Sequence, residues 1–158
     1  MLSLTRRYHF SASHRLHSPL LSASENAAVF GKCNNPHGHG HNYVLSVTAA
    51  GEVDERTGLL VRIKDLDRLV DEKVLHLFAH HDINRDVPEF SGLIPTTENI
   101  ALIIAGLLQQ SWGGYLDGAK VHLERVHVQE TERNGFEVVI SAAPVINEFR
   151  REGVLVHA

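Results

Sequence analysis

The sequence predicts an α+β domain in which two helices cover one face of an antiparallel sheet. Two strand-like segments come first, two segments with helical spacing follow, and two more strand-like segments come last, which gives the order β-β-α-α-β-β. No linker rich in proline, glycine or serine divides the 158 residues, and this length fits one ordinary domain. We expect that domain to span 1–142, with 143–158 as a C-terminal extension of unknown role.

The first pair of strands is predicted at 4–12 and 43–49. The first segment alternates with a period of two, which places one set of residues on a single face: Leu4, Arg6, Tyr8, Phe10 and Ala12. The second segment is rich in residues that favour strands, and we expect it to pair antiparallel with the first.

The two helices are predicted at 65–78 and 97–112. In the first, a stripe at helical spacing is expected to face the core: Leu66, Leu69, Val70, Val74, Leu77 and Phe78. In the second, the corresponding stripe is Ile100, Ile103, Ile104, Leu107 and Leu108. Pro95 and a capping hydroxyl from the Thr96–Thr97 pair mark its start, and Gly113–Gly114 is expected to end it.

The second pair of strands is predicted at 121–130 and 136–140, on either side of a turn at 133–135. The two-residue alternation of apolar side chains shifts between Leu123 and Val126, which indicates a β-bulge. A small sheet has two edges that must be covered or paired, so we expect an oligomer that pairs edges between subunits.

Composition and charge exclude two kinds of partner. With 15 Lys and Arg against 19 Asp and Glu, the net charge is −4, which argues against nucleic acid because phosphate backbones demand a basic surface. No apolar run approaches the roughly 18 residues of a membrane span, and no apolar signal core follows the basic pair near the N-terminus. We therefore expect a cytoplasmic protein with no membrane partner.

Three histidines alternate with glycines at 37–41, in a chain that holds 12 histidines. In extended backbone, residues two apart point the same way, so His39 and His41 can reach one ion, and His14 is expected at the same end of the sheet. Three neutral imidazoles suit Zn(II) and leave a fourth position for substrate or water. The spacing alone does not distinguish zinc from copper or nickel. The alternative to a metal site is a set of solvated loop histidines. His37 is either exposed or an outer neighbour of the ion.

Three further features each have a chemical and a structural interpretation. Cys33, the one cysteine, lies beside Lys32 in a loop of Gly, Asn and Pro, and we favour a reactive thiol acting as a base over a small buried residue. The pair His80–His81 follows the first helix and is either a proton carrier or an offset to the helix dipole. Glu130 is either a surface charge or a bidentate partner for a heterocycle with two adjacent N–H donors. By charge, Arg15 and Lys32 are candidates for contacting phosphates.

These motifs together resemble the family of 6-pyruvoyltetrahydropterin synthase and 6-carboxytetrahydropterin synthase. The resemblance covers about 10–137 and rests on Phe-Ser-Ala-Ser-His-Arg-Leu at 10–16, on Thr-Thr-Glu-Asn at 96–99, and above all on Cys-Asn-Asn-Pro-His-Gly-His-Gly-His-Asn-Tyr at 33–43. It implies a tunnelling fold (T-fold), in which trimers close their sheets into a barrel. It also implies that the trimers stack as a homo-hexamer, a dimer of trimers, with active sites between subunits.

The resemblance further implies a role for each motif. The residues that match zinc ligands are His14, His39 and His41. Those that match catalytic residues are Cys33 and His80, and those that match the pterin site are Glu130, Thr96, Thr97 and Glu98. The implied activity is that of a zinc-dependent lyase in tetrahydrobiopterin biosynthesis, which converts 7,8-dihydroneopterin triphosphate to 6-pyruvoyltetrahydropterin with loss of triphosphate. The alternative is 6-carboxytetrahydropterin synthase of the queuosine pathway, which releases acetaldehyde and triphosphate. The stretch 20–43 looks closer to the pyruvoyl-forming enzymes.

One position departs from the family pattern. The family typically has Asp immediately before the catalytic histidine, and here Ala79 precedes His80. An orienting carboxylate fixes the tautomer of such a histidine, so our hypothesis is that Asp82 or Asp86 takes this role. Ala79 also motivates a further alternative, a pterin- and zinc-binding protein with impaired catalysis. A relative that cleaves dihydroneopterin as an aldolase is disfavoured by Cys33, since that branch of the family carries Glu at or near this position.

Overall fold

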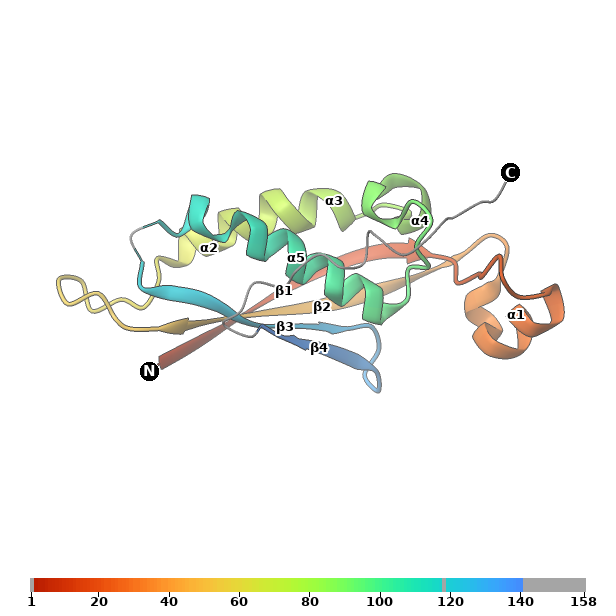
Figure 1. Ribbon diagram of the computed structural model, residues 1–158, viewed down its shortest axis with the longest axis horizontal. Helices are drawn as coiled ribbons and strands as arrows, with labels where there is room; N and C mark the ends of the chain where they lie inside the picture. Colours follow the sequence, from red (N-terminus) through yellow and green to blue (C-terminus); the bar gives the residue numbers. More distant parts are fainter. Residues whose placement is uncertain (1, 118, 141–158) are drawn as a thin grey trace, which may run out of the picture.

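A computed structural model of the chain describes residues 2–117 and 119–140, so the predicted extension at 143–158 lies outside the described residues. Within them, one antiparallel sheet has the strand order β1 (Leu2–His14), β2 (His39–Gly51), β3 (Val121–Gln129) and β4 (Gly135–Val139). The long helices cover one face of this sheet (Figure 1). The predicted α+β class and the order of its main elements are confirmed.

Two long helical segments lie on the sheet, as predicted. The first consists of α2 (Ile63–Val70) and α3 (His76–Phe78), joined without a break by a π-helical turn at Asp71–Leu75. The second is α5 (Thr97–Tyr115). The elements without a counterpart in the prediction are the short helices α1 (Ala23–Phe30) and α4 (Ile83–Asp86) and the 3-10 turns Gly31–Asn34 and Pro88–Phe90.

The two ends of α5 differ in how well the sequence predicts them. At its start, the Thr96 hydroxyl accepts a hydrogen bond from the Asn99 backbone N–H at 3.3 Å, which confirms the predicted cap. The predicted end at Gly113–Gly114 is wrong, because the helix runs through both glycines. The Trp112 indole N–H donates to the Val121 carbonyl at 3.1 Å, and this tertiary contact outweighs the low helix propensity of glycine.

Both N-terminal strands are longer than predicted. β1 and β2 pair over their whole length, from Leu2 opposite Gly51 to His14 opposite His39. Gly40, between the two histidines, weakens the strand pattern in the sequence, whereas in the structure it pairs with Ser13 of β1. The histidines at 39 and 41 therefore belong to β2 itself and share its fixed alternation of faces.

The predicted bulge is confirmed and lies in β3. The register between β2 and β3 shifts by one residue at Thr48 and Ala49, so Glu124 has no partner in β2. This extra residue allows both Leu123 and Val126, which are three positions apart, to be buried in the core.

The helix α1 lies apart from the other helices, beyond the ends of β1 and β2 (Figure 1). It starts with a capping box, in which the Ser22 hydroxyl accepts from the Glu25 N–H at 3.2 Å and the Glu25 carboxylate accepts from the Ser22 N–H at 2.8 Å. Asn26 is fully buried, and its side-chain amide donates to the carbonyls of Ser18 and Leu21. The Ser-x-x-Glu pattern at 22–25 is thus a readable signal for a helix that the sequence analysis missed.

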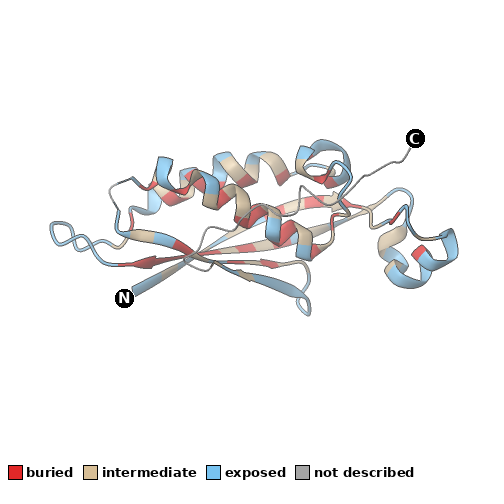
Figure 2. Ribbon diagram, in the orientation of Figure 1, coloured by how far each residue is buried: buried red, intermediate tan, exposed pale blue. Residues whose placement is uncertain are grey.

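The core lies between the sheet and the helices that cover it (Figure 2). The predicted helical stripes are confirmed as part of it, although Leu77, Ile103 and Leu107 are only partly buried. Among the described residues, no helix combines the length and the apolar character that crossing a membrane requires.

Two glycines lead to opposite stability predictions. An added Cβ at Gly51 would lie 2.0 Å from the carbonyl oxygen of Lys120, whereas at Gly113 it would meet nothing within 4 Å. We expect Gly51→Ala to lower the free energy of unfolding by about 1–3 kcal/mol, because the paired backbone has to shift. Gly113→Ala should raise it by up to about 1 kcal/mol, because alanine favours the helix. Urea denaturation followed by circular dichroism measures both changes, and a Gly51→Ala chain of unchanged stability would contradict this packing.

Candidate metal centre and active site

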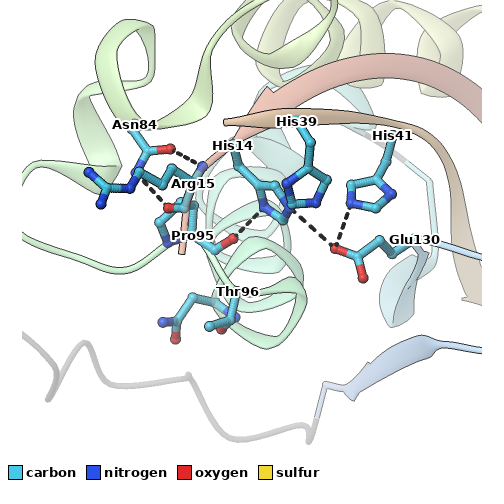
Figure 3. A network of polar contacts seen from close by, with 9 residues as sticks. His14, Arg15, His39, His41, Asn84, Pro95, Thr96 and Glu130 are labelled. Atoms are coloured by element: carbon cyan, nitrogen blue, oxygen red, sulfur yellow. Dashed lines mark hydrogen bonds and ion pairs between the residues drawn. The ribbon is translucent and has the colours of Figure 1, made fainter. Parts of the chain in front are cut away.

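Three histidine side chains meet where β1 ends and β2 begins. His14 is the last residue of β1 and pairs with His39, while His41 pairs with Ala12. All three imidazoles lie on the helix-facing side of the sheet, and one nitrogen from each lies within 4.8 Å of the others (Figure 3). The sheet register thus brings together the three residues that the sequence analysis singled out, although 25 positions separate His14 from His39. Their role as metal ligands stays a prediction.

A backbone carbonyl fixes the tautomer of His14. The Nδ1–H of this buried side chain donates to the Pro95 carbonyl at 2.8 Å, which leaves Nε2 free of a proton in the neutral ring. That Nε2 lies 3.3 Å from Nε2 of His39. Burial is the main cause that lowers the pKa of both His14 and His39. Two facing neutral nitrogens need a proton or a metal ion between them, because their lone pairs repel.

The residues of this site fit a zinc ion. Nδ1 of His39 and Nε2 of His41 are buried and have no hydrogen-bond partner among the described residues. An unpaired buried nitrogen is costly in a protein interior, and a cation held by the Nε2 atoms of the three rings would remove that cost for His41. Nδ1 of His39 lies on the other side of its ring and would not reach the same ion. Zinc takes imidazole nitrogen ligands, and three protein ligands leave a coordination position open for a substrate.

Glu130 lies directly after β3 and beside the three histidines. Its Oε1 is 3.7 Å from Nε2 of His14 and 3.7 Å from Nε2 of His41 (Figure 3). The register that pairs Val44 with Gln129 places Glu130 next to Tyr43 across the sheet. The role of Glu130 as the anchor of a pterin ring stays a prediction.

Cys33 belongs to the 3-10 turn Gly31–Asn34, and the chain that leaves β1 holds this turn in place. The Cys33 carbonyl accepts a hydrogen bond from the Leu16 N–H at 2.8 Å. Burial raises the pKa of the half-buried thiol, and the negative charge of Glu130 raises it further. The polypeptide alone therefore favours the protonated thiol, and activation of Cys33 as a base would need a nearby cation.

His80 occupies an unusual backbone conformation just after α3. Its φ of 66° lies in the left-handed region, which residues other than glycine seldom adopt. The His80 N–H donates to the Ser11 carbonyl at 2.6 Å, and the His81 N–H donates to the Phe78 carbonyl at 3.2 Å, so the turn is held at both residues. Strain of this kind is often retained at functional sites, which agrees with the predicted catalytic role.

The side chain of His80 is not joined to the histidine cluster within one chain. It is exposed and lines a shallow cavity of about 430 Å³ together with Ser11, His41, Asn42 and Asp82. None of the hydrogen bonds among the described residues connects its imidazole to Cys33 or to the three clustered histidines.

The two carboxylates proposed to replace the family Asp have other partners. Asp82 caps α4, because its Oδ1 accepts from the Asn84 N–H at 3.0 Å. Asp86 accepts from the Asp82 N–H at 2.8 Å. Within the described part of the chain neither carboxylate hydrogen-bonds to His80, so the structure gives the hypothesis no support.

The segment 95–98 contacts the site through its backbone. The Pro95 carbonyl binds His14, while Thr96 caps α5, Thr97 is buried and Glu98 is exposed. Sequence reasoning missed the contribution of Pro95, because a carbonyl group carries no side-chain signal.

Removing the side chain of His80 separates its strain from its chemistry. We expect His80→Gly to keep or raise the free energy of unfolding, by up to about 1 kcal/mol, because glycine adopts positive φ without strain. Turnover of the substrate should fall by about 10²–10⁴, the usual contribution of a proton-transferring residue. His80→Ala is the matched variant and should lose turnover without gaining stability. If His80→Gly keeps full turnover, His80 carries no proton in the reaction.

The sheet topology and the helices on one face define the class of protein: this is an α+β protein of the T-fold, with three histidines at the strand ends that could hold a metal ion. Residues 3–140 match the family model described as 6-pyruvoyl tetrahydropterin synthase, and the chain belongs to this family.

Two relatives and one solved structure illustrate the similarity. The chain is 47% identical over 107 residues to 6-pyruvoyl tetrahydrobiopterin synthase of Homo sapiens, which covers 68% of this chain and 74% of the human protein. The solved structure of Caenorhabditis elegans 6-pyruvoyl tetrahydropterin synthase superimposes with a TM-score of 0.78 at 37% identity, covering 89% of this chain and 96% of that chain. A 6-carboxy-5,6,7,8-tetrahydropterin synthase of Bacillus subtilis is 33% identical over 132 residues, which is 81% of this chain and 78% of that protein.

Proposed function

We propose that this chain is a zinc-dependent lyase that converts 7,8-dihydroneopterin triphosphate to 6-pyruvoyltetrahydropterin and releases triphosphate. The observation that carries the proposal is the cluster of His14, His39 and His41 with Glu130 beside it, in a chain of this family. The unpaired, buried Nε2 of His41 supports zinc as the cofactor.

Each site residue has a task in this reaction. Glu130 accepts hydrogen bonds from adjacent N–H groups of the pterin ring, and the residues at 96–98 lie near that ring. The Sγ of Cys33 takes a proton from the substrate side chain, and His80 carries protons to and from it. A zinc ion held by His14, His39 and His41 would polarise the side-chain hydroxyls of the substrate and make the neighbouring C–H group more acidic.

Two alternatives have specific support. The Bacillus subtilis relative favours the carboxy-forming reaction, but the human relative is more similar and carries the pyruvoyl name. Ala79 favours a pterin-binding protein with impaired catalysis, since neither Asp82 nor Asp86 forms a hydrogen bond with the imidazole of His80 among the described residues.

Identification of products by mass spectrometry tests these readings. The zinc-loaded protein is incubated with 7,8-dihydroneopterin triphosphate, and the expected products are 6-pyruvoyltetrahydropterin and triphosphate. A carboxy product with acetaldehyde would favour the first alternative, and no product despite pterin binding would favour the second. Activity should disappear with a chelator and return with zinc, whereas chelator-resistant turnover would contradict zinc dependence.

We propose further that the chain assembles as a homo-hexamer. The 80–82 segment pairs with the end of β1, but apolar residues are exposed near both free edges of the sheet: Leu2 on β1 is 59% exposed and Val139 on β4 is 67% exposed. An active site between subunits also agrees with the exposed imidazole of His80, which no hydrogen bond among the described residues connects to Cys33 or to the clustered histidines of its own chain. Light scattering coupled to size exclusion should give six copies, and a monomer would contradict the proposal.

A cytoplasmic location stays a prediction.

A further inference from the structure

Arg15 leaves β1 immediately after His14, and its backbone is fixed on both sides by one side chain. The Arg15 N–H donates to Oδ1 of Asn84 at 2.7 Å, and Nδ2 of Asn84 donates to the Arg15 carbonyl at 3.0 Å (Figure 3). Neighbouring Cα atoms lie about 3.8 Å apart, so Arg15 has a defined position next to the histidine cluster.

The guanidinium of Arg15 keeps most of its donors available. Its Nε donates to the Asn34 carbonyl at 3.3 Å, and Nη2 lies 3.4 Å from Nδ1 of His17. In the part of the chain that the structure describes, no carboxylate forms an ion pair with this guanidinium, whereas the neighbouring Arg85 pairs with Asp82 at 3.6 Å. Arginine has five N–H donors and no acceptor, so Arg15 presents an uncompensated positive charge with free donors.

The groups around Arg15 are also donors. Nδ2 of Asn34 donates to the Leu16 carbonyl at 2.7 Å and lies 3.1 Å from Nδ1 of His17. Because the Arg15 and Asn34 nitrogens can only donate, Nδ1 of His17 is the acceptor, and the N–H of that ring is on Nε2. The same turn contains Cys33, whose carbonyl binds the Leu16 N–H, so this donor-rich surface is tied to the predicted catalytic thiol.

The three imidazoles lie between Arg15 and Glu130, as Figure 3 shows. The substrate has the same linear order, since its hydroxylated side chain joins the pterin ring to the triphosphate. We propose that Arg15, with His17 and Asn34, binds the triphosphate group, so that the ring is held at Glu130 and the side chain lies across the histidines. An arginine fork matches phosphate oxygens with two parallel hydrogen bonds, which makes it well suited to this group. The assignment rests on the proposed function, because only a phosphorylated pterin needs this subsite.

Binding of two oxidised pterins tests the subsite without turnover. Neopterin and neopterin triphosphate share the ring and the side chain and differ only in the triphosphate. Their dissociation constants are measured by pterin fluorescence for the unchanged chain and for Arg15→Gln, at equal zinc content. We expect Arg15→Gln to raise the dissociation constant of neopterin triphosphate by about tenfold to a hundredfold, which is the effect of one hydrogen-bonded charge pair. The dissociation constant of neopterin should stay unchanged.

Arg85→Gln is the matched control, because it removes the same charge from the same region at a residue that already has a carboxylate partner. It should bind both ligands as the unchanged chain does. The assignment of the triphosphate subsite would be overturned if Arg15→Gln still bound neopterin triphosphate more tightly than neopterin by the original factor, or if it lost the same affinity for both pterins. Either result would leave the proposed reaction intact. If the unchanged chain binds neither pterin, the proposed function fails and the subsite fails with it.

Discussion

The variant His39→Ala is expected to lose its zinc and, with it, essentially all turnover. His39 faces His14 with a nitrogen–nitrogen distance of 3.3 Å, and two imidazoles with a carboxylate 3.7 Å away are a poorer donor set for zinc than three imidazoles. Changes to residues that only support metal ligands cost about 10- to 100-fold in affinity or activity, so loss of a ligand itself should exceed a hundredfold. Metal analysis after dialysis should give one zinc per unchanged chain and almost none in the variant.

His37→Ala is the matched control for this experiment. It removes an imidazole from the same glycine-rich motif, but the His37 side chain is exposed and lies outside the cluster. We expect the control to retain its zinc and its turnover. If His39→Ala keeps zinc at the stoichiometry of the unchanged chain, the three histidines are not the metal centre.

The three candidate metal ligands could be predicted because two of them are close in the sequence and the third follows from the expected pairing of the first two strands. His39 and His41 are two residues apart, and alternation along a strand places them on one face. His14 required the further inference that the first two strands are antiparallel partners, and the register confirms it by pairing His14 with His39. Both inferences depend on the two-residue alternation of a strand and on the pairing of neighbouring strands, and the sequence pattern predicts both.

Other contributions to the site are invisible in the sequence for physical reasons. The Pro95 carbonyl and the Asn84 amide act through contacts between segments 69 or more positions apart. The end of α5 was predicted wrongly at Gly113–Gly114, because tertiary contacts of Trp112 override local propensity. Helix α1 is a different case, since its capping box at 22–25 is readable and was overlooked.

The second large effect is expected for Cys33→Ala. If Sγ takes a proton from the substrate, its removal should lower turnover by about 10²–10⁴, the range for a general base. Pterin binding should persist, because Glu130 and the histidines stay in place. Single-turnover kinetics with fluorescence titration separates the two effects. A Cys33→Ala chain with full turnover would show that another group is the base.

The titration of the thiol gives an independent test of its surroundings. Burial and the negative charge of Glu130 both raise the pKa of Cys33, so the metal-free chain should react with iodoacetamide only as the pH rises above the usual thiol range of about 8.5. Glu130→Gln removes the charge and should move the reactivity midpoint to lower pH, and a bound zinc ion should move it in the same direction. The sign follows from charge, since a negative neighbour opposes thiolate formation and a positive neighbour favours it. A midpoint that Glu130→Gln leaves unchanged would mean that the carboxylate and the thiol do not share one site.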